Sequence, residues 1–446
     1  MIAEGNARSA GDPAHALYTR SVERASGDSR AGRLRKQVRQ SEGLAALRHL
    51  GYRIYFAGML ARGTAVWMTF VALPWLAVER GATPLQLGVV TAALFVPTFF
   101  ISPFGGVLAD RVNRLSVLLV TQMGAAIHAA VLLFFVAAGL ASIEALAVFA
   151  LLFGVLMATE MPVRQSLLGD LVPPAEVTSA VTLHATAWNS TRFLGPALAG
   201  VLIATVGVGA CFVVGAGASI LVALSILVQR RLMRHQRPVE RVDRSVLGSL
   251  RDGMRFAAAS PRIRGAMLIL SFGGILGIQA FQTLAPLYVS DTLKLGGGAF
   301  GAFMAVWGAG ALAGTFAVTL FGRGDRRRWL LVGATSLSVV LAILSLTRWP
   351  PAAFALAGLL GIAQISMIQS AMITVQQAAT DEFRGRVMGL YVMLFQGTAP
   401  IGALLAGILA VAIGVPGAML VGAAGLALVV LLTTIRPALS AGAPSA

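Results

Sequence analysis

Long apolar runs, separated by short polar connections, occupy most of the chain from residue 50 onward. In a window of about 19 residues, twelve of these runs are apolar enough to cross a bilayer as helices. They begin near Tyr52, Leu85, Leu115, Ala145, Val177, Ala210, Arg264, Ala299, Trp329, Ala352, Val387 and Ala418. Hydrocarbon offers no hydrogen-bond partner, and a helix satisfies its backbone within one segment. The pattern therefore predicts an all-α membrane protein with twelve transmembrane helices.

Two short patterns recur in the same order in the second half of the chain. Pro74, at the end of the first run, has a counterpart in Pro286, 212 positions later. The stretch Gly195-Pro196-Ala197-Leu198-Ala199-Gly200 has a counterpart 207 positions later, beginning at Gly402. Such similar offsets indicate that a six-helix unit was duplicated. Two halves related by an axis along the membrane normal form a known transporter architecture.

The predicted organisation has five parts. Polar, arginine-rich residues precede the first run and lack the apolar core of a signal peptide, so we expect a disordered tail there. A second polar segment separates the sixth run from the seventh. The parts are a cytoplasmic tail (1–49), an N-terminal six-helix half (50–230), a cytoplasmic linker (231–262), a C-terminal six-helix half (263–436) and a cytoplasmic tail (437–446).

Composition agrees with a lipid environment. Of the 446 residues, 57% are hydrophobic and 12% are charged, whereas about a quarter are charged in soluble proteins. Cys211 is the single cysteine, which excludes an intrachain disulfide and a multi-cysteine metal site. The sequence has no G-x-x-x-x-G-K-[ST] loop and no metal or nucleophile constellation. We therefore expect no cofactor, no metal and no enzymatic activity.

The net charge of +17 is distributed asymmetrically. Thirty of the 35 basic residues fall on one side of the predicted membrane, and three, Arg80, Lys294 and Arg348, fall on the other. Basic loops stay in the cytoplasm, so both termini are predicted to be cytoplasmic. The basic excess thus reflects membrane topology, and we expect no nucleic-acid partner.

The connection between the second and third runs reads Gly106-Val107-Leu108-Ala109-Asp110-Arg111-Val112-Asn113-Arg114. In this position the pattern resembles the loop between helices 2 and 3 of the major facilitator superfamily. The stretches Glu160-x-Pro-x-Arg-Gln and Asn189-x-x-Arg192-x-x-Gly-Pro-Ala-x-Ala-Gly resemble the branch that contains enterobactin exporters and bacterial drug-efflux proteins. The resemblance covers about residues 50–436 and implies transport by alternating access.

The resemblance also implies that this loop is a gate, which joins the two halves in one state and releases them in the other. Asp110 could pair with Arg114 or Arg164, or face the positive end of a helix. The alternative is a loop that only sets the topology. The candidate gating residues are Gly106, Asp110, Arg111, Arg114, Arg384 and Arg386.

Charged residues inside the spans are costly and are usually paired or functional. Arg62 lies about 14 Å and Glu160 about 15 Å along their helices from the cytoplasmic end, at 1.5 Å per residue. Because the depths match, we expect these two side chains to pair, with Arg164 sharing the carboxylate. Protonation of Glu160 would release the pair, which suits proton coupling. A static bridge that holds the half together is the equal alternative.

The fifth run carries a motif with two parts. Gly195, Pro196 and Gly200 permit a bend and close helix approach, and the resemblance implies that this is the antiporter signature of exporters. Arg192 lies about 22 Å into that run, at 1.5 Å per residue, and Asn189 is one turn away. They could contact an anionic group of the cargo or cap a neighbouring helix, and structural packing is the simpler interpretation.

The second half offers neutral polar side chains in its spans. Those on the seventh and tenth runs could orient cargo, or could form interhelical hydrogen bonds. They are Gln279, Gln282, Gln364 and Gln369.

Together these features predict a monomeric exporter in the cytoplasmic membrane that exchanges protons for a small amphipathic cargo, a drug or a siderophore. An importer of the same fold, and a membrane sensor that transports nothing, are the alternatives.

Overall fold

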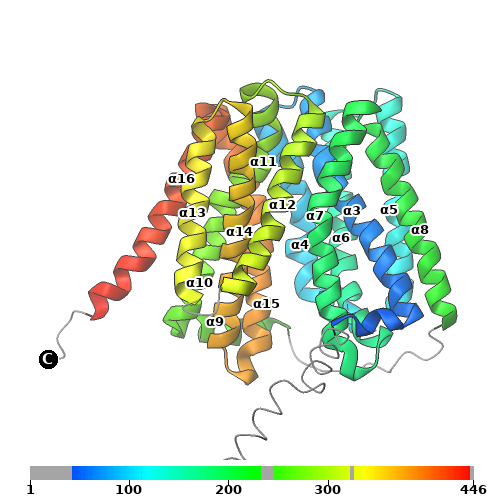
Figure 1. Cartoon of the computed structure of the whole chain (residues 1–446), viewed down its shortest axis with the longest axis horizontal. Helices are drawn as coiled ribbons and strands as arrows, with labels where there is room; N and C mark the ends of the chain where they lie inside the picture. Colours follow the sequence, from blue (N-terminus) through cyan, green and yellow to red (C-terminus); the bar gives the residue numbers. More distant parts are fainter. Residues whose placement is uncertain (1–42, 112, 233–245, 322–325, 442–446) are drawn as a thin grey trace, which may run out of the picture.

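The computed structural model describes residues 43–111, 113–232, 246–321 and 326–441, and within these residues all regular structure is helical. The side chains of residues 102–111 lie outside the described part. So does nearly all of the predicted N-terminal tail. The described residues form two groups of helices that stand side by side (Figure 1).

The first group contains six long helices and two short 3-10 turns. Its elements are η1 (Ala45–Arg48), α3 (Leu50–Glu79), α4 (Pro84–Arg111), α5 (Arg114–Ala137), α6 (Ile143–Leu171), η2 (Pro174–Glu176), α7 (Val177–Thr205) and α8 (Gly209–Leu232). Polar caps begin two of these helices. Asn113 accepts a hydrogen bond from the backbone of Ser116, and Ser142 accepts one from Ala145.

The second group begins with a short helix from the predicted linker. Its elements are α9 (Val246–Ala259), α10 (Pro261–Phe272), η3 (Gly273–Ile278), α11 (Gln279–Leu287), η4 (Tyr288–Thr292), α12 (Gly297–Phe321), α13 (Arg326–Leu346), α14 (Pro350–Ala378), α15 (Asp381–Gly397) and α16 (Ala399–Ala441). The turns η3 and η4 are π-helical, so the segment from α10 to η4 is one continuous crossing with two local irregularities.

The described helices make twelve crossings, as the sequence predicts. Ten segments satisfy the length and hydropathy expected of a membrane span. One of them, Glu382–Ile435, contains two crossings, because Gly414 adopts a φ of 76° that reverses the chain. The twelfth is α7, which has 29 residues but a more polar sequence. The all-α fold with twelve transmembrane helices is confirmed.

The two groups pack against each other through glycine, with α7 on α12 and α4 on α16. A Cβ placed on Gly301 would overlap the backbone of Gly200, and one on Gly88 would lie 2.8 Å from the carbonyl oxygen of Ala403. All of these residues lie in the half of the bundle farther from Gly43 and Ala441, the first and last described residues of the chain. Small residues allow this close backbone approach in lipid.

The same face of α7 is open in the half of the bundle nearer the termini. Positions 182 and 186 continue, at helical spacing, the face that packs on α12 through Pro196 and Gly200. Thr182 and Thr186 are nonetheless exposed, while Pro196 and Gly200 are buried. The halves are therefore closed together at one end and separated along α7 at the other.

Replacement of Gly301 by alanine should destabilise the closed end. The added methyl group meets backbone atoms that have little room to move, and overpacking typically costs about 1–3 kcal/mol. Gly217→Ala is the matched control, since Gly217 is helical, exposed and has open space around its Cα. Thermal unfolding in detergent should show a lower Tm for Gly301→Ala and no loss for Gly217→Ala. Equal Tm values would contradict the packing described here.

Candidate functional site

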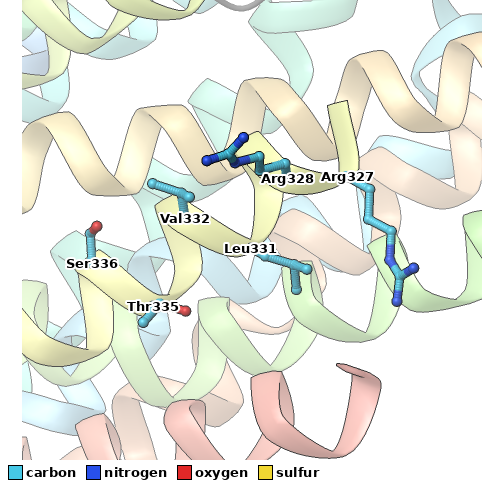
Figure 2. A pocket seen from close by; sticks show the side chains of 6 residues that line it. All are labelled: Arg327, Arg328, Leu331, Val332, Thr335 and Ser336. Carbon is cyan, nitrogen blue, oxygen red and sulfur yellow. The ribbon is translucent and has the colours of Figure 1, made fainter. Parts of the chain in front are cut away.

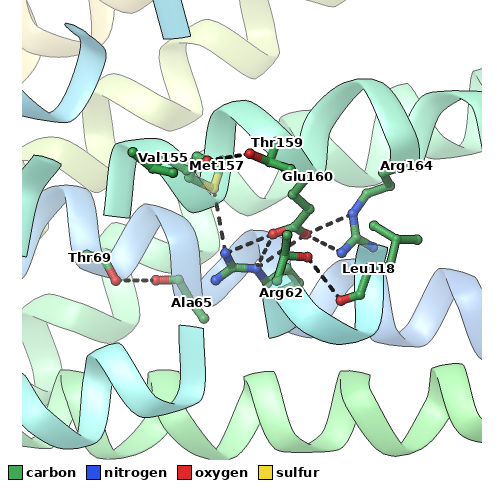
Figure 3. A network of polar contacts seen from close by, with 10 residues as sticks. Arg62, Ala65, Thr69, Leu118, Val155, Met157, Thr159, Glu160 and Arg164 are labelled. Carbon is green, nitrogen blue, oxygen red and sulfur yellow. Dashed lines mark hydrogen bonds and ion pairs between the residues drawn. The ribbon is translucent and has the colours of Figure 1, made fainter. Parts of the chain in front are cut away.

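Three charged side chains meet inside the first half and form what we call the charged triad: Arg62, Glu160 and Arg164 (Figure 3). Arg62 projects from α3, while Glu160 and Arg164 lie four residues apart on α6 and so share one helix face. The Nε and Nη2 atoms of Arg62 lie 3.0 and 2.9 Å from Oε2 of Glu160. Arg164 donates from Nε at 3.0 Å, and also from Nη2, to Oε1. The pairing expected from the matched depths is confirmed.

The charged triad is sealed from solvent. Arg62, Glu160 and Arg164 are 3%, 2% and 4% exposed. With all three groups ionised, the triad carries a net charge of +1. A buried carboxylate that accepts hydrogen bonds on both oxygens from two guanidinium groups is a strong, directional interaction, and it ties α3 to α6.

Aromatic and polar neighbours surround the charged triad. The guanidinium of Arg164 lies 5.9 Å from the ring centre of Tyr55, and Tyr55 shares a hydrogen bond of 2.9 Å with Nδ1 of His184 on α7. Arg62 lies 5.9 Å from the ring centre of Phe153. On its other side, Arg62 borders a cavity of about 10 Å³ that His128 also lines, about the size of one water. His128 itself donates from Nε2 to the carbonyl oxygen of Phe149 at 2.9 Å.

Two of the candidate gating residues, Arg114 and Arg386, each pair with a carboxylate on another helix. Arg114 forms an ion pair of 2.5 Å with Asp170 at the end of α6. Arg386 lies 3.4 Å from Asp252 on α9, where the stacked rings of Phe256 and Phe383 join α9 to α15. Arg164, the other expected partner of Asp110, belongs to the charged triad. The side chains of Gly106, Asp110 and Arg111 lie outside the described part, and Arg384 has contacts of its own.

The motif on α7 is built into a helix crossing. Gly195 lets the backbone of α7 rest on Trp67 and Thr64 of α3, and Pro196 lies inside α7. Arg192 places its guanidinium 4.9 Å from the ring centre of Trp67, a cation–π arrangement. Asn189, one turn away, is half-buried.

Two of the four candidate glutamines bond to other helices. Oε1 of Gln364 accepts a hydrogen bond of 3.1 Å from Trp307 on α12, and Gln369 donates to Thr315 at 3.2 Å. Gln279 accepts from Thr283 at 3.5 Å, within α11. Gln282 is half-buried on the same helix. The geometry thus gives Gln364 and Gln369 an interhelical bonding role in this conformation.

A more spacious recess lies in the other half, away from the charged triad (Figure 2). It has a volume of about 500 Å³ on the surface of α13, and it is lined by Arg327, Arg328, Leu331, Val332, Thr335 and Ser336. Its arginines mark the same end of the bundle as the termini. Among the described residues, no group of three His, Cys, Asp or Glu side chains could hold a metal ion.

Sequence reasoning missed the aromatic partners and the acidic ends of the helices. Asp170 could have been found, because the ends of α5 and α6 that carry Arg114 and Asp170 were predicted on the same side of the membrane. Trp67 gave no such signal, since a tryptophan in an apolar span is ordinary. Its importance follows only from its contacts with Arg192 and with Trp307 of the second half, whose ring centre is 6.1 Å away.

Residues 41–443 match the family described as transmembrane secretion effector. The chain belongs to this family of major facilitator transporters. It is 27% identical over 372 residues to the multidrug efflux pump Tap of Mycolicibacterium fortuitum, covering 81% of this chain and 89% of Tap. Over 139 residues it is 31% identical to the staphyloferrin A transporter of Staphylococcus aureus, covering 31% and 35% of the two chains.

The fold agrees with that of solved transporters. A mutant of the nucleoside transporter NupG superposes with a TM-score of 0.70 at 14% identity, covering 86% of this chain and 99% of NupG. Membership of the family makes the protein a multi-span transporter of the cell membrane and not an enzyme.

Loss of the carboxylate should destabilise the first half strongly. Glu160→Gln leaves two buried arginines without a counter-charge, and breaking a buried ion pair costs about 3–5 kcal/mol. Glu144→Gln is the matched control, because Glu144 is exposed at the start of the same helix. SDS titration of the purified protein should show the large loss in free energy of unfolding for Glu160→Gln alone.

A double variant tests whether charge is the cause. Arg62→Gln combined with Glu160→Gln returns the triad to a net charge of +1, so it should recover part of the lost stability. If the double variant is less stable than Glu160→Gln, shape and not charge holds this site together.

Proposed function

We propose that the protein exports a small amphipathic molecule from the cytoplasm in exchange for protons, working as a monomer by alternating access. The observation that carries this proposal is the asymmetric packing of the two halves, closed along Gly200 and Gly301 and open along Thr182 and Thr186. An arrangement closed at one end only is what one state of an alternating-access transporter requires.

The orientation follows from the distribution of charge. At the end of the bundle away from the termini, the described basic residues are Arg80, Lys294 and Arg348. The opposite end carries the remaining basic helix termini, including Arg230, Arg231 and those of the recess on α13. By the positive-inside rule, that basic end and both termini face the cytoplasm. The conformation is then open to the cytoplasm, ready to receive cargo for export.

The direction of transport is supported by two features. The Gly195-Pro196 crossing on α7 matches the exporter motif that the sequence resembles, and Tap, a relative along most of the chain, is named as a multidrug efflux pump. The siderophore transporter is a relative over a shorter stretch. A drug or a siderophore is accordingly the proposed class of cargo.

Proton coupling is proposed at the charged triad. Glu160 is the one described carboxylate in the middle of the spans. It joins α6 to α3 through Arg62, and it also pairs with Arg164 on its own helix. Protonation would remove the charge that binds both guanidinium groups, so the packing of α3 on α6 would change. Both helices belong to the first half, which would move relative to the second during transport. The change in packing could therefore alter the contact between α7 and α12, where the two halves meet.

Cysteine labelling should report the orientation. In a Cys211→Ser background, Thr186→Cys on the open face should react with a membrane-impermeant maleimide in inside-out vesicles and be protected in right-side-out vesicles. Leu140→Cys, which is exposed in the loop between α5 and α6, should show the reverse. Labelling of position 186 from the outside would mean that the open end faces the exterior.

Proton exchange tests the function directly. Inside-out vesicles are energised to an acid interior, and cationic drugs, macrolides and a catecholate siderophore are added in turn. At least one class should cause proton release with wild type and with Glu144→Gln, and none with Glu160→Gln or the double variant. Release that survives in Glu160→Gln would place the coupling group elsewhere. If no class of compound causes proton release with wild type, the result would count against a proton-coupled exporter of these compounds.

A further inference from the structure

Arg192 is a cation in the interior of the spans whose charge has no acidic partner among the described residues. Its Nε atom is buried and makes no hydrogen bond. The guanidinium lies over the ring of Trp67, and Nε1 of Trp67 is also a buried donor without an acceptor. Buried donors are nearly always satisfied in folded proteins. Two unsatisfied donors on neighbouring side chains therefore indicate a missing acceptor.

These donors lie at the junction between the closed and open parts of the interface. The backbone of Arg192 is covered by Gly308 of α12, and Trp67 contacts Trp307 of the same helix. About two and three turns nearer the cytoplasmic end, Thr186 and Thr182 are exposed. A group that enters along the open face would thus meet Arg192 where the halves close.

The charge of the span interior points to an anion. The described interior charges are Arg62, Arg164 and Arg192 against Glu160, a net charge of +2. The charged triad accounts for one of these positive charges and Arg192 for the other. Charge inside a membrane is costly unless it is compensated. An anionic ligand at Arg192 would supply the compensation that this chain lacks.

The walls beside Arg192 are aromatic. Trp67 contacts Phe70, whose ring stacks on Phe95 at 5.7 Å, and Trp307 contacts Phe281 at 6.1 Å. Trp67, Phe70 and Phe95 are each partly exposed. Such walls favour an aromatic or extended apolar body, while the two donors fix an acidic group at its end.

We infer that Arg192 and Trp67 bind the acidic group of the cargo, and that the cargo is an amphipathic organic anion, a carboxylate joined to an aromatic body. The inference rests on the proposed function, because it names the cargo of that same transporter. The inference narrows the proposed cargo from amphipathic drugs in general to those with an acidic group.

Matched probes test the site by binding. The full chain in detergent is dialysed against 2-naphthoate, 2-naphthamide or 2-naphthylmethylammonium, which share one ring system and differ in charge. The variants are Arg192→Gln, Arg192→Lys and Trp67→Phe. Arg348→Gln is the control, since it removes an exposed arginine in the connection between α13 and α14. Dialysis is run in gluconate and repeated in chloride.

Wild type should bind naphthoate at least about tenfold more tightly than the amide, because hydrogen bonds to a charged group are the stronger kind. In Arg192→Gln the ratio should fall to about one, through weaker binding of naphthoate with the amide unchanged. Retained amide binding shows that the variant is folded. Arg192→Lys should keep part of the preference, Trp67→Phe should reduce it, and Arg348→Gln should match wild type.

Three results would overturn the inference: no saturable binding of naphthoate, equal binding of naphthoate and amide by wild type, or an unchanged ratio in Arg192→Gln. Displacement of naphthoate by chloride would also overturn it, by assigning the site to an inorganic anion. Failure of the proposed function is distinguishable. If naphthoate binding depends on Arg192 but no proton exchange occurs, the proposed exporter function is wrong and the anion site stands. If proton exchange occurs and is unchanged in Arg192→Gln, the anion site is wrong and the exporter function stands.

Discussion

The cost of charge in hydrocarbon governs the interior of this protein. Several kcal/mol are lost when an ion leaves water without a partner, yet three arginines and one glutamate of the described residues lie within the spans. Glu160 offsets much of that cost for Arg62 and Arg164, because its carboxylate accepts hydrogen bonds from both guanidinium groups. Glu160 therefore joins α6 to α3 through its contact with Arg62, and it also pairs with Arg164 on its own helix. Removal of that carboxylate disturbs two arginines and two helices together.

Glycine residues determine where the N-terminal half contacts the C-terminal half. Gly200 and Gly301 bring α7 and α12 into backbone contact, and Gly88 and Gly407 do the same for α4 and α16. Backbone contact of this kind is either present or absent, since atoms in close contact cannot be compressed further. Two such seams at one end of the bundle give an interface with discrete closed and open arrangements, as alternating access needs. The charged triad lies within the first half and does not cross this interface, so the proposed proton coupling would have to act through the packing of α3 on α6.

The sequence predicted the features that depend on one-dimensional pattern. Apolar length predicted twelve crossings, and residue count along each helix predicted that Arg62 and Glu160 meet, because rise per residue converts directly into depth. Contacts that depend on how each helix is rotated about its own axis could not be predicted in this way. The partner of Arg114 is Asp170 and that of Arg386 is Asp252, and both choices depend on which way a helix end faces. The cation–π contact between Trp67 and Arg192 could not be predicted either, because sequence spacing does not determine which apolar residue of another helix packs against a given arginine.

An anionic cargo has an energetic consequence for the proposed exchange. The free energy of one elementary charge changes by about 2.3 kcal/mol when it crosses a membrane with a potential of 100 mV. The outward movement of a monoanion and the inward movement of a proton both carry positive charge inward, in the direction that a negative interior favours. One exchange would then gain about 4.6 kcal/mol from the potential alone. A neutral cargo would gain half of that, and a monovalent cation would gain nothing. The unpaired Arg192, by selecting an anion, would therefore make the membrane potential the main driving force, with the pH gradient adding to it.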